Sequence, residues 1–293
     1  MASFLHHADM RIATLAQILP SAQLRISASY AKSGVYGYGG DNMREYIVKI
    51  KPLTPIWTGD VNRKCKTLRE TGVLGSLRWW YEVLIRGLGG SACDPTSDAK
   101  CPDKNGNRCD ACELFGCTGW SRKFRLEVEK QDSEITLNFI ELRKMKNIEW
   151  GLLNKTLQII ADFGAIGGKI AESKYGLVKI EHNDLKDFSL DKIELEGYLK
   201  KEGSNIENPN IRRFIFINHN LKYEIVKDLK KNLPFIKGKP GKGKRYFYKT
   251  FNRKPYRFFA YAENDGEYRQ IIEFLRSKSV QFVEGKRFLE GLV

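Results

Sequence analysis

The sequence feature that most constrains the fold is the order in which strand-like and helix-like hydrophobic patterns follow one another along the chain. Stretches in which every second side chain favours a β-strand alternate with stretches in which apolar side chains recur on one helical face. In the first half these stretches predict strand, helix, strand, strand, helix and strand, in that order, at residues 44–53, 72–88, 124–128, 135–141, 148–163 and 176–181. A β-α-β-β-α-β order is that of the ferredoxin-like unit.

The same order of elements recurs more faintly in the second half of the chain. Its strands and helices are predicted at residues 214–217, 222–232, 246–251, 257–262, 267–275 and 280–283. We therefore expect an α+β protein of two ferredoxin-like (βαββαβ, RRM-like) domains, at residues 43–182 and 183–293. The polar stretch 183–210 is interpreted as a connection or an insertion, and residues 1–42, dominated by Ala, Ser, Gly and Tyr, as a poorly ordered N-terminal extension.

The charge balance indicates a polyanionic partner. The 293 residues include 50 Lys and Arg against 35 Asp and Glu, a formal net charge of +15. Nucleic acid is the first candidate and an anionic membrane surface the second. No run of about 18 apolar residues exists, which excludes a membrane-spanning helix, and no basic amphipathic helix favours a membrane surface. Because no signal peptide is visible, we expect a cytoplasmic protein.

The most basic segment runs from Lys230 to Arg257. It holds eleven Lys or Arg and no acidic residue, with six aromatic residues interleaved. Charge combined with aromatic faces is what a groove for single-stranded nucleic acid requires, and we expect these cations to contact mostly phosphates. A Gly- and Pro-rich stretch inside the segment is predicted to form an exposed hairpin tip. The candidate nucleic-acid contacts there are Lys237, Lys239, Lys242, Lys244 and Arg245.

Two further phosphate sites are candidates in the first half. Glycines in the loop 164–169 would let the backbone approach a phosphate closely, and Lys169 and Lys174 add charge beside it. The predicted helix that starts at Gly72 would present free amides at its N-terminus. The cations before that helix start include Arg63, Lys64 and Arg69. The glycines could equally serve only to cap a helix and shape a loop.

Two tryptophans, Trp57 and Trp79, are candidates for stacking on nucleic-acid bases. Trp57 lies in a predicted turn after the first strand and is the best candidate. Trp79 and Trp80 are adjacent on a predicted helix and therefore point about 100° apart. Trp80 fits the buried stripe of that helix. Trp79 is predicted either to pack against the second domain or to offer a surface for bases or a partner.

Several local motifs of the first half resemble those of the RAMP superfamily of CRISPR proteins. Within it, the match is to the first-numbered subunit of the Cmr, or type III-B, RNA-targeting effector complex. The motifs are LTPIWTG at residues 53–59, LRETGVLGSLRWWYE at 68–82, ACDPT at 92–96, CELFGCTGW at 112–120 and the glycine-rich loop. The resemblance is strong over residues 43–182 and weak beyond, and residues 1–42 have no counterpart in it.

The resemblance implies two ferredoxin-like domains, RNA binding and a non-catalytic role. It places such a subunit at the end of the complex that holds the 3′ part of the guide RNA. The expected partners are guide RNA, target RNA and other Cmr subunits. It also assigns the family's glycine-rich loop to Gly164, Gly167 and Gly168.

Five of the six cysteines cluster between residues 93 and 117. The pair Cys109 and Cys112, separated by two residues, is a good half-site for zinc. Cys93 and Cys101 could supply the other half, whereas Cys117 looks like part of the adjacent Phe-Gly turn. The alternative is that these thiols stay reduced and without metal in a reducing cell. We expect no cofactor to be required for function beyond this possible structural zinc.

The histidines give little support for an enzyme. The four histidines form no pair with catalytic or metal-binding spacing inside the predicted domains, and no tight carboxylate cluster suggests two-metal chemistry. We therefore expect no catalytic residues. The rival interpretation is a metal-independent CRISPR RNA-processing endoribonuclease of the same superfamily, with His219 as general base.

Overall fold

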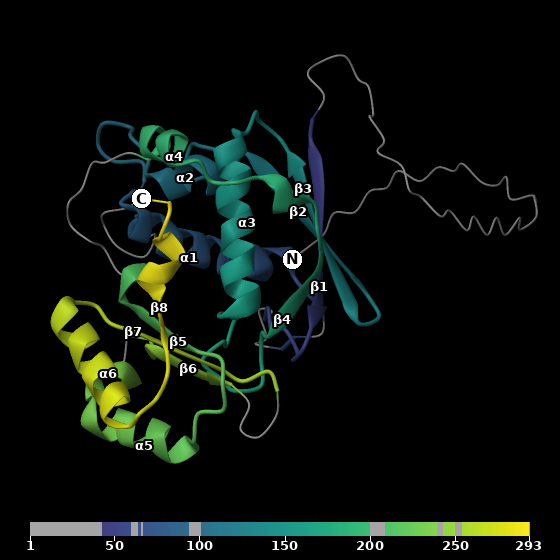
Figure 1. The fold of residues 1–293 in the computed structure, drawn as a ribbon. Coiled ribbons are helices and arrows are strands. Elements are labelled where there is room, and N and C mark those ends of the chain that lie inside the picture. Colours follow the sequence, from purple (N-terminus) through teal and green to yellow (C-terminus); the bar gives the residue numbers. More distant parts are fainter. Residues whose placement is uncertain are drawn as a thin grey trace, which may run out of the picture. The chain divides into compact units, whose positions relative to one another are not determined.

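The computed structural model describes residues 43–59, 64–65, 67–93, 101–199, 209–238, 243–249 and 254–292. The predicted extension at residues 1–42 lies outside these ranges, and residues 43–293 form one compact unit. That unit contains two four-stranded antiparallel sheets with helices packed on them (Figure 1). The expected α+β class is therefore confirmed. None of the helices in the described ranges is long and apolar enough to cross a bilayer.

The first sheet has the strand order β2-β3-β1-β4, with antiparallel neighbours throughout. Helices α1 and α3 lie against this sheet (Figure 1). The elements of this half are β1 (Glu45–Pro52), α1 (Glu70–Leu88), α2 (Asp110–Phe115), β2 (Phe124–Gln131), β3 (Glu134–Glu141), α3 (Asn147–Asp162) and β4 (Val178–Asn183).

Alternation along the strands explains how this half buries its core. Ile135, Leu137 and Phe139 on β3 are almost fully buried, while the residues between them are half-exposed. Because successive strand side chains point to opposite faces, one face of the sheet is apolar and faces the helices. The predicted buried stripe of α1 is also confirmed, since Val73, Leu77 and their helical neighbours are buried. The left-handed conformation of Gly89, with φ 91°, ends α1.

The second sheet has the strand order β6-β7-β5-β8, again antiparallel. Helices α5 and α6 cover one of its faces (Figure 1). The elements of this half are the 3-10 helix η2 (Ile211–Arg213), β5 (Phe214–Ile217), α5 (Tyr223–Asn232), η3 (Pro234–Lys237), β6 (Tyr246–Lys249), β7 (Arg257–Tyr261), α6 (Asp265–Ser277), β8 (Val283–Glu284) and η4 (Gly285–Leu289).

The segment between the halves is more structured than a simple connection. It contains η1 (Asp184–Asp187) and α4 (Lys192–Tyr198). Leu185 and Leu195 from these elements are buried in the same core as α1 and α3. Sequence analysis missed both elements because the segment is mostly polar and each element contributes one buried leucine.

Strand β5 is buried on both faces, which explains how the two halves pack. Ile215 and Ile217 belong to the core under α5 and α6, whereas Phe214 and Phe216 join the core of the first half. Trp79 contacts Phe214 at a ring-centroid distance of 6.2 Å, so its predicted packing against the second half is confirmed. The predicted boundary between residues 182 and 183 falls inside the compact unit, and the two-domain division stays a prediction.

Candidate nucleic-acid interface

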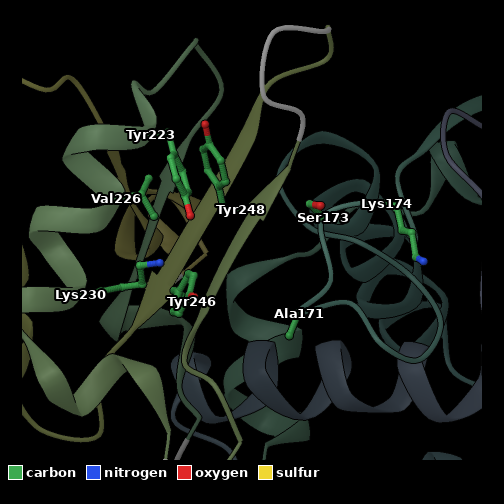
Figure 2. Close-up of a pocket in the computed structure, with 8 residues that line it drawn as sticks. All are labelled: Ala171, Ser173, Lys174, Tyr223, Val226, Lys230, Tyr246 and Tyr248. Carbon is green, nitrogen blue, oxygen red and sulfur yellow. The ribbon is translucent and has the colours of Figure 1, made fainter.

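A cavity of about 690 Å³ lies between the loop that follows α3 and the second sheet. This volume lies in the usual range for ligand pockets. One side carries three tyrosines and a lysine, and the other side is formed by Ala171, Ser173 and Lys174 (Figure 2). The described lining residues are Ala171, Ser173, Lys174, Tyr223, Val226, Lys230, Tyr246 and Tyr248, without a histidine or a carboxylate among them.

The tyrosines reach the cavity from two elements. Tyr246 and Tyr248 occupy alternate positions of β6 and share one face, while Phe247 between them is buried against Phe259 at a ring-centroid distance of 4.7 Å. Tyr223, at the start of α5, lies 6.1 Å from Tyr248 between ring centroids. Burial raises the pKa of Tyr246 and of Tyr248, so both hydroxyls stay neutral at physiological pH. The cavity therefore presents half-buried aromatic rings.

Helix α5 places cations at and beside the cavity, where Lys230 is part of the lining. Lys227 and Lys230 follow Tyr223 at positions i+4 and i+7, on the same helical face. The Nζ atoms of Lys227 and Lys230 lie 5.0 and 5.5 Å from the centroid of the Tyr223 ring, within range of a cation–π contact. Sequence analysis missed Tyr223 and Lys227 because they precede the basic run, although this helical spacing is a signal for them.

A second cavity, of about 490 Å³, shares Lys230 and Tyr246 with the first. Its described lining is otherwise made of lysines, with no carboxylate to balance them: Lys227, Lys231, Lys237 and Lys244. Two of these, Lys237 and Lys244, were predicted contacts and are exposed. Lys239 and Lys242 lie outside the described residues. The first cavity is lined mainly by tyrosines and the adjoining second cavity mainly by lysines. We call the described lining of the two cavities together the Tyr–Lys surface.

The opposite side of the first cavity includes Lys174, one of the predicted contacts. Its side chain is exposed, and its ammonium group points away from the tyrosines (Figure 2). It lies 4.0 Å from the Glu172 carboxylate, which also lies 3.8 Å from the ammonium group of Lys169. The charge of these two predicted contacts is therefore partly balanced within the protein.

The glycine-rich loop packs closely on two tryptophans. The amide of Gly168 donates to the Trp57 carbonyl oxygen at 2.6 Å, and Gly167 adopts φ 95°. A Cβ atom on Gly168 would lie 2.7 Å from the Trp57 ring, and one on Gly164 would lie 2.6 Å from the Trp80 ring. The close packing against Trp57 and Trp80 is therefore sufficient to require glycine at these positions, without any bound phosphate. Phosphate binding by the loop stays a prediction.

Trp57 is held in the same arrangement. Its ring is half-buried, covers Gly59 and Gly168, and lies 4.5 Å from the Nζ atom of Lys169. Its predicted stacking on a base stays a prediction, but the ring already has a structural role. An antiparallel bridge between Trp57 and Gly168 places Trp57 beside the glycine-rich loop.

The loop that carries Trp57 also contacts the start of α1. Thr58 Oγ1 accepts a hydrogen bond from the Arg69 amide at 2.9 Å, and Gly72 packs against the Thr58 side chain. Lys64 and Arg69 are exposed near this helix start, as predicted for phosphate contacts. Arg63 lies outside the described residues.

Two arginines of the basic run are buried, and one of them is Arg245, a predicted RNA contact. Arg245 is 7% exposed and pairs with the carboxylates of Glu263 and Glu267, each at 2.7 Å. Arg257 is equally buried and donates to the carbonyl oxygens of Ile160 and Gly164 at the end of α3. Burial lowers the pKa of Arg257 to about 10, which leaves it charged at neutral pH. Both side chains are committed to the fold.

The four cysteines predicted as metal ligands lie together. The Sγ atoms of Cys93, Cys101, Cys109 and Cys112 are all within 4.8 Å of one another. Cys117 instead forms an antiparallel bridge with Trp120, as expected for a turn residue. The spatial grouping thus agrees with the predicted ligand set.

Both histidines of the described residues, His182 and His219, have polar partners. The Nε2 atom of His219 lies 2.8 Å from the Gln281 carbonyl oxygen, and His182 lies 2.7 Å from the Asp184 carboxylate. His219 is exposed and is not part of the described lining of either cavity.

Comparison with known protein families decides the ancestry of the chain. The model of the RAMP superfamily matches residues 49–283, which is most of the sequence. The chain belongs to the RAMP superfamily. A search of curated proteins finds no match for this RAMP protein.

Solved structures similar to this RAMP protein include subunits of Cmr complexes. Cmr1 from Pyrococcus furiosus, in its apo form, is 12% identical with a TM-score of 0.45, over 83% of this chain and 98% of that chain. A chain of the type III-B Cmr-beta complex bound to cognate target RNA is 14% identical with a TM-score of 0.38, over 64% and 73%. A chain of the same complex with target RNA, AMPPnP and ssDNA is 13% identical with a TM-score of 0.45, over 80% and 99%.

Proposed function

We propose that this RAMP protein is an RNA-binding, non-catalytic subunit of a type III-B CRISPR (Cmr) antiviral effector complex. It contacts guide RNA near its 3′ end, target RNA or both, beside other Cmr subunits in the cytoplasm. Family membership supports the proposal, and so do the motifs at residues 53–59, 68–82 and 112–120 that resemble the Cmr subunit. The observation that carries RNA binding is the Tyr–Lys surface.

We also infer that each half is a ferredoxin-like unit. In both sheets the first and third strands of the half lie in the centre, and the second and fourth lie at the edges. Both halves follow the order β-α-β-β-α-β, with α2 inserted in the first. This arrangement is what the ferredoxin-like unit requires.

The Tyr–Lys surface suits a single RNA strand. Tyrosine rings offer stacking platforms to any base, because every base has a π-face. The adjoining lysines would neutralise phosphates without reading sequence. We therefore expect a base or two to occupy the tyrosine-lined cavity while the backbone runs past Lys230 toward Lys231, Lys237 and Lys244. Binding should show little sequence preference.

Loss of an aromatic ring in the cavity should weaken RNA binding without changing its salt dependence. For Tyr223→Ala and for Tyr246→Ala we expect affinity to fall by about 1–3 kcal/mol, which is the usual loss for one stacked base. Fluorescence anisotropy with labelled single-stranded RNA, repeated over a range of salt concentrations, would measure both quantities. Free guide, free target and guide–target duplex should be compared to find the main ligand.

The matched controls are Tyr223→Phe and Tyr246→Phe, which keep the ring and remove the hydroxyl. They should bind RNA as the unmutated protein does. Equal losses in the Ala and Phe variants would show that the hydroxyls matter and that stacking does not. Unchanged affinity in both Ala variants would exclude the cavity as an RNA site.

A binding role is also favoured by the chemistry of the cavity. Its described lining offers tyrosine, lysine and serine hydrogen-bonding groups but no histidine or carboxylate, which are the more usual general bases at neutral pH. Incubation of the pure protein with labelled guide precursor and with target RNA, in Mg²⁺ and in EDTA, should leave both intact. Site-specific cleavage that disappears in His219→Ala would instead establish the endoribonuclease.

A further inference from the structure

We propose that Cys93, Cys101, Cys109 and Cys112 bind one structural Zn²⁺ ion. Four thiolates at about 2.3 Å from a tetrahedral zinc ion lie about 3.8 Å from one another. The four Sγ atoms are already within 4.8 Å of one another, and those of Cys93 and Cys112 are 3.5 Å apart. Small adjustments of side-chain torsions therefore suffice to form the site.

Backbone amides already point at the sulfur atoms. The amides of Cys93 and Cys112 each donate to the Sγ atom of Cys109 at 3.3 Å, and the Cys109 amide donates to Cys101 Sγ at 3.2 Å. Such hydrogen bonds favour the thiolate form that metal binding requires. Ordinary buried cysteines packed as small apolar groups have no need for three of them.

A cation beside the cluster would compensate its charge. Four thiolates and one Zn²⁺ carry a net charge of −2. The guanidinium of Arg78 lies 3.2 Å from Cys112 Sγ and is fixed by hydrogen bonds to Glu82 and to the Gly116 carbonyl oxygen, at 2.8 and 3.0 Å. Partners that orient and balance the ligands in this way are typical of protein metal sites.

The ligand set identifies the metal and its role. Soft thiolates select zinc over magnesium or calcium, and four protein ligands leave no position open for water or substrate. The site is therefore structural. Among the described residues, no other group of three or more Cys, His, Asp or Glu side chains lies close enough to share an ion.

The metal would stabilise the contact between the two halves. Cys93 follows α1, and the carbonyl oxygens of Ala92 and Cys93 accept hydrogen bonds from Arg86 at 2.9 to 3.4 Å. The same guanidinium donates to the carbonyl oxygen of Pro209, just before η2, at 3.2 Å. A metal that fixes Cys93 thus fixes the acceptors that orient Arg86 toward the second half.

The site can be tested on the full chain purified under reducing conditions without added metal. Elemental analysis should find about one zinc per chain, and Co²⁺ in its place should give thiolate charge-transfer bands and the visible bands of a tetrahedral ion. Cys109→Ser combined with Cys112→Ser should lose the zinc. Cys117→Ser is the matched control, because Cys117 lies in the same segment outside the cluster, and it should keep the zinc.

Stability gives a second readout. A strong chelator should lower the unfolding temperature of the unmutated chain and of Cys117→Ser. If the double variant does not fold, the Co²⁺ spectrum of the unmutated chain decides the question. The proposal is overturned if the reduced, unmutated chain takes up no zinc or Co²⁺, if it holds iron instead, if Cys117→Ser also loses the metal, or if mass spectrometry finds a Cys93–Cys112 disulfide in the cellular protein.

Discussion

Replacement of four lysines of the Tyr–Lys surface by glutamine should lower RNA affinity by two to three orders of magnitude at about 0.1 M salt. The four are Lys227, Lys230, Lys231 and Lys244. They line the second cavity, whose described lining contains no carboxylate. Each phosphate neutralised on a single strand contributes about 0.7 to the slope of log affinity against log salt, so the slope should become shallower by about 2.8. Glutamine keeps most of the aliphatic stem, so packing against the tyrosines changes little.

The matched control replaces four exposed lysines outside the Tyr–Lys surface, Lys144, Lys179, Lys186 and Lys192, by glutamine. Both variants have the same net charge, and anisotropy titrations at several salt concentrations would compare them. The control should keep an affinity within a few-fold of the unmutated protein. If both variants lose affinity equally, RNA is attracted by the net charge alone and the Tyr–Lys surface is not its site.

Local elements were predictable from the sequence because their patterns are local. The alternating residues 135–141 correspond to β3 (Glu134–Glu141), and the stripe at 72–88 corresponds to α1 (Glu70–Leu88). The last strand was less well placed, since it was expected at residues 280–283 and β8 is Val283–Glu284. Its two residues are too few for a periodic pattern to emerge.

The candidate site was harder to predict because it depends on contacts between distant residues. Tyr223 joins Tyr246 and Tyr248 only through the packing of α5 against the second sheet. In the sequence, Arg245 looks like its neighbour Lys244, yet carboxylates at positions 263 and 267 hold it inside the protein. Composition indicates how much charge a segment carries, whereas the fold decides which charges reach solvent.

The cysteine spacing was more informative, since a metal half-site needs ligands that are close in the sequence. Cys109 and Cys112 satisfy that need directly. Cys93 and Cys101 were less certain members, and the structure brings their Sγ atoms to the same cluster because α2 packs beside the end of α1. Zinc itself stays a prediction.

Replacement of Arg257 by methionine should destabilise the protein by about 3 kcal/mol. The buried guanidinium donates to the carbonyl oxygens of Ile160, Ala161 and Gly164, so it terminates α3 and fixes the start of the glycine-rich loop. Methionine fills similar space but leaves these acceptors without a charged donor, and buried hydrogen bonds to a charged group are worth about 1.5–3 kcal/mol each. The loss also removes a cation from the negative end of the helix dipole. The free energy of unfolding in urea would measure the change.

Lys254→Met is the matched control, because Lys254 belongs to the same basic run but is exposed. Its free energy of unfolding should change by less than about 0.5 kcal/mol, as is usual for surface substitutions. Arg257→Met, measured where it is still folded, should keep the parental salt dependence of RNA binding, since its guanidinium is buried. A shallower salt slope with unchanged stability would contradict the structural role and return Arg257 to the group of RNA-binding cations. The two variants thus separate the cations of one segment into those that hold the fold and those that face the ligand.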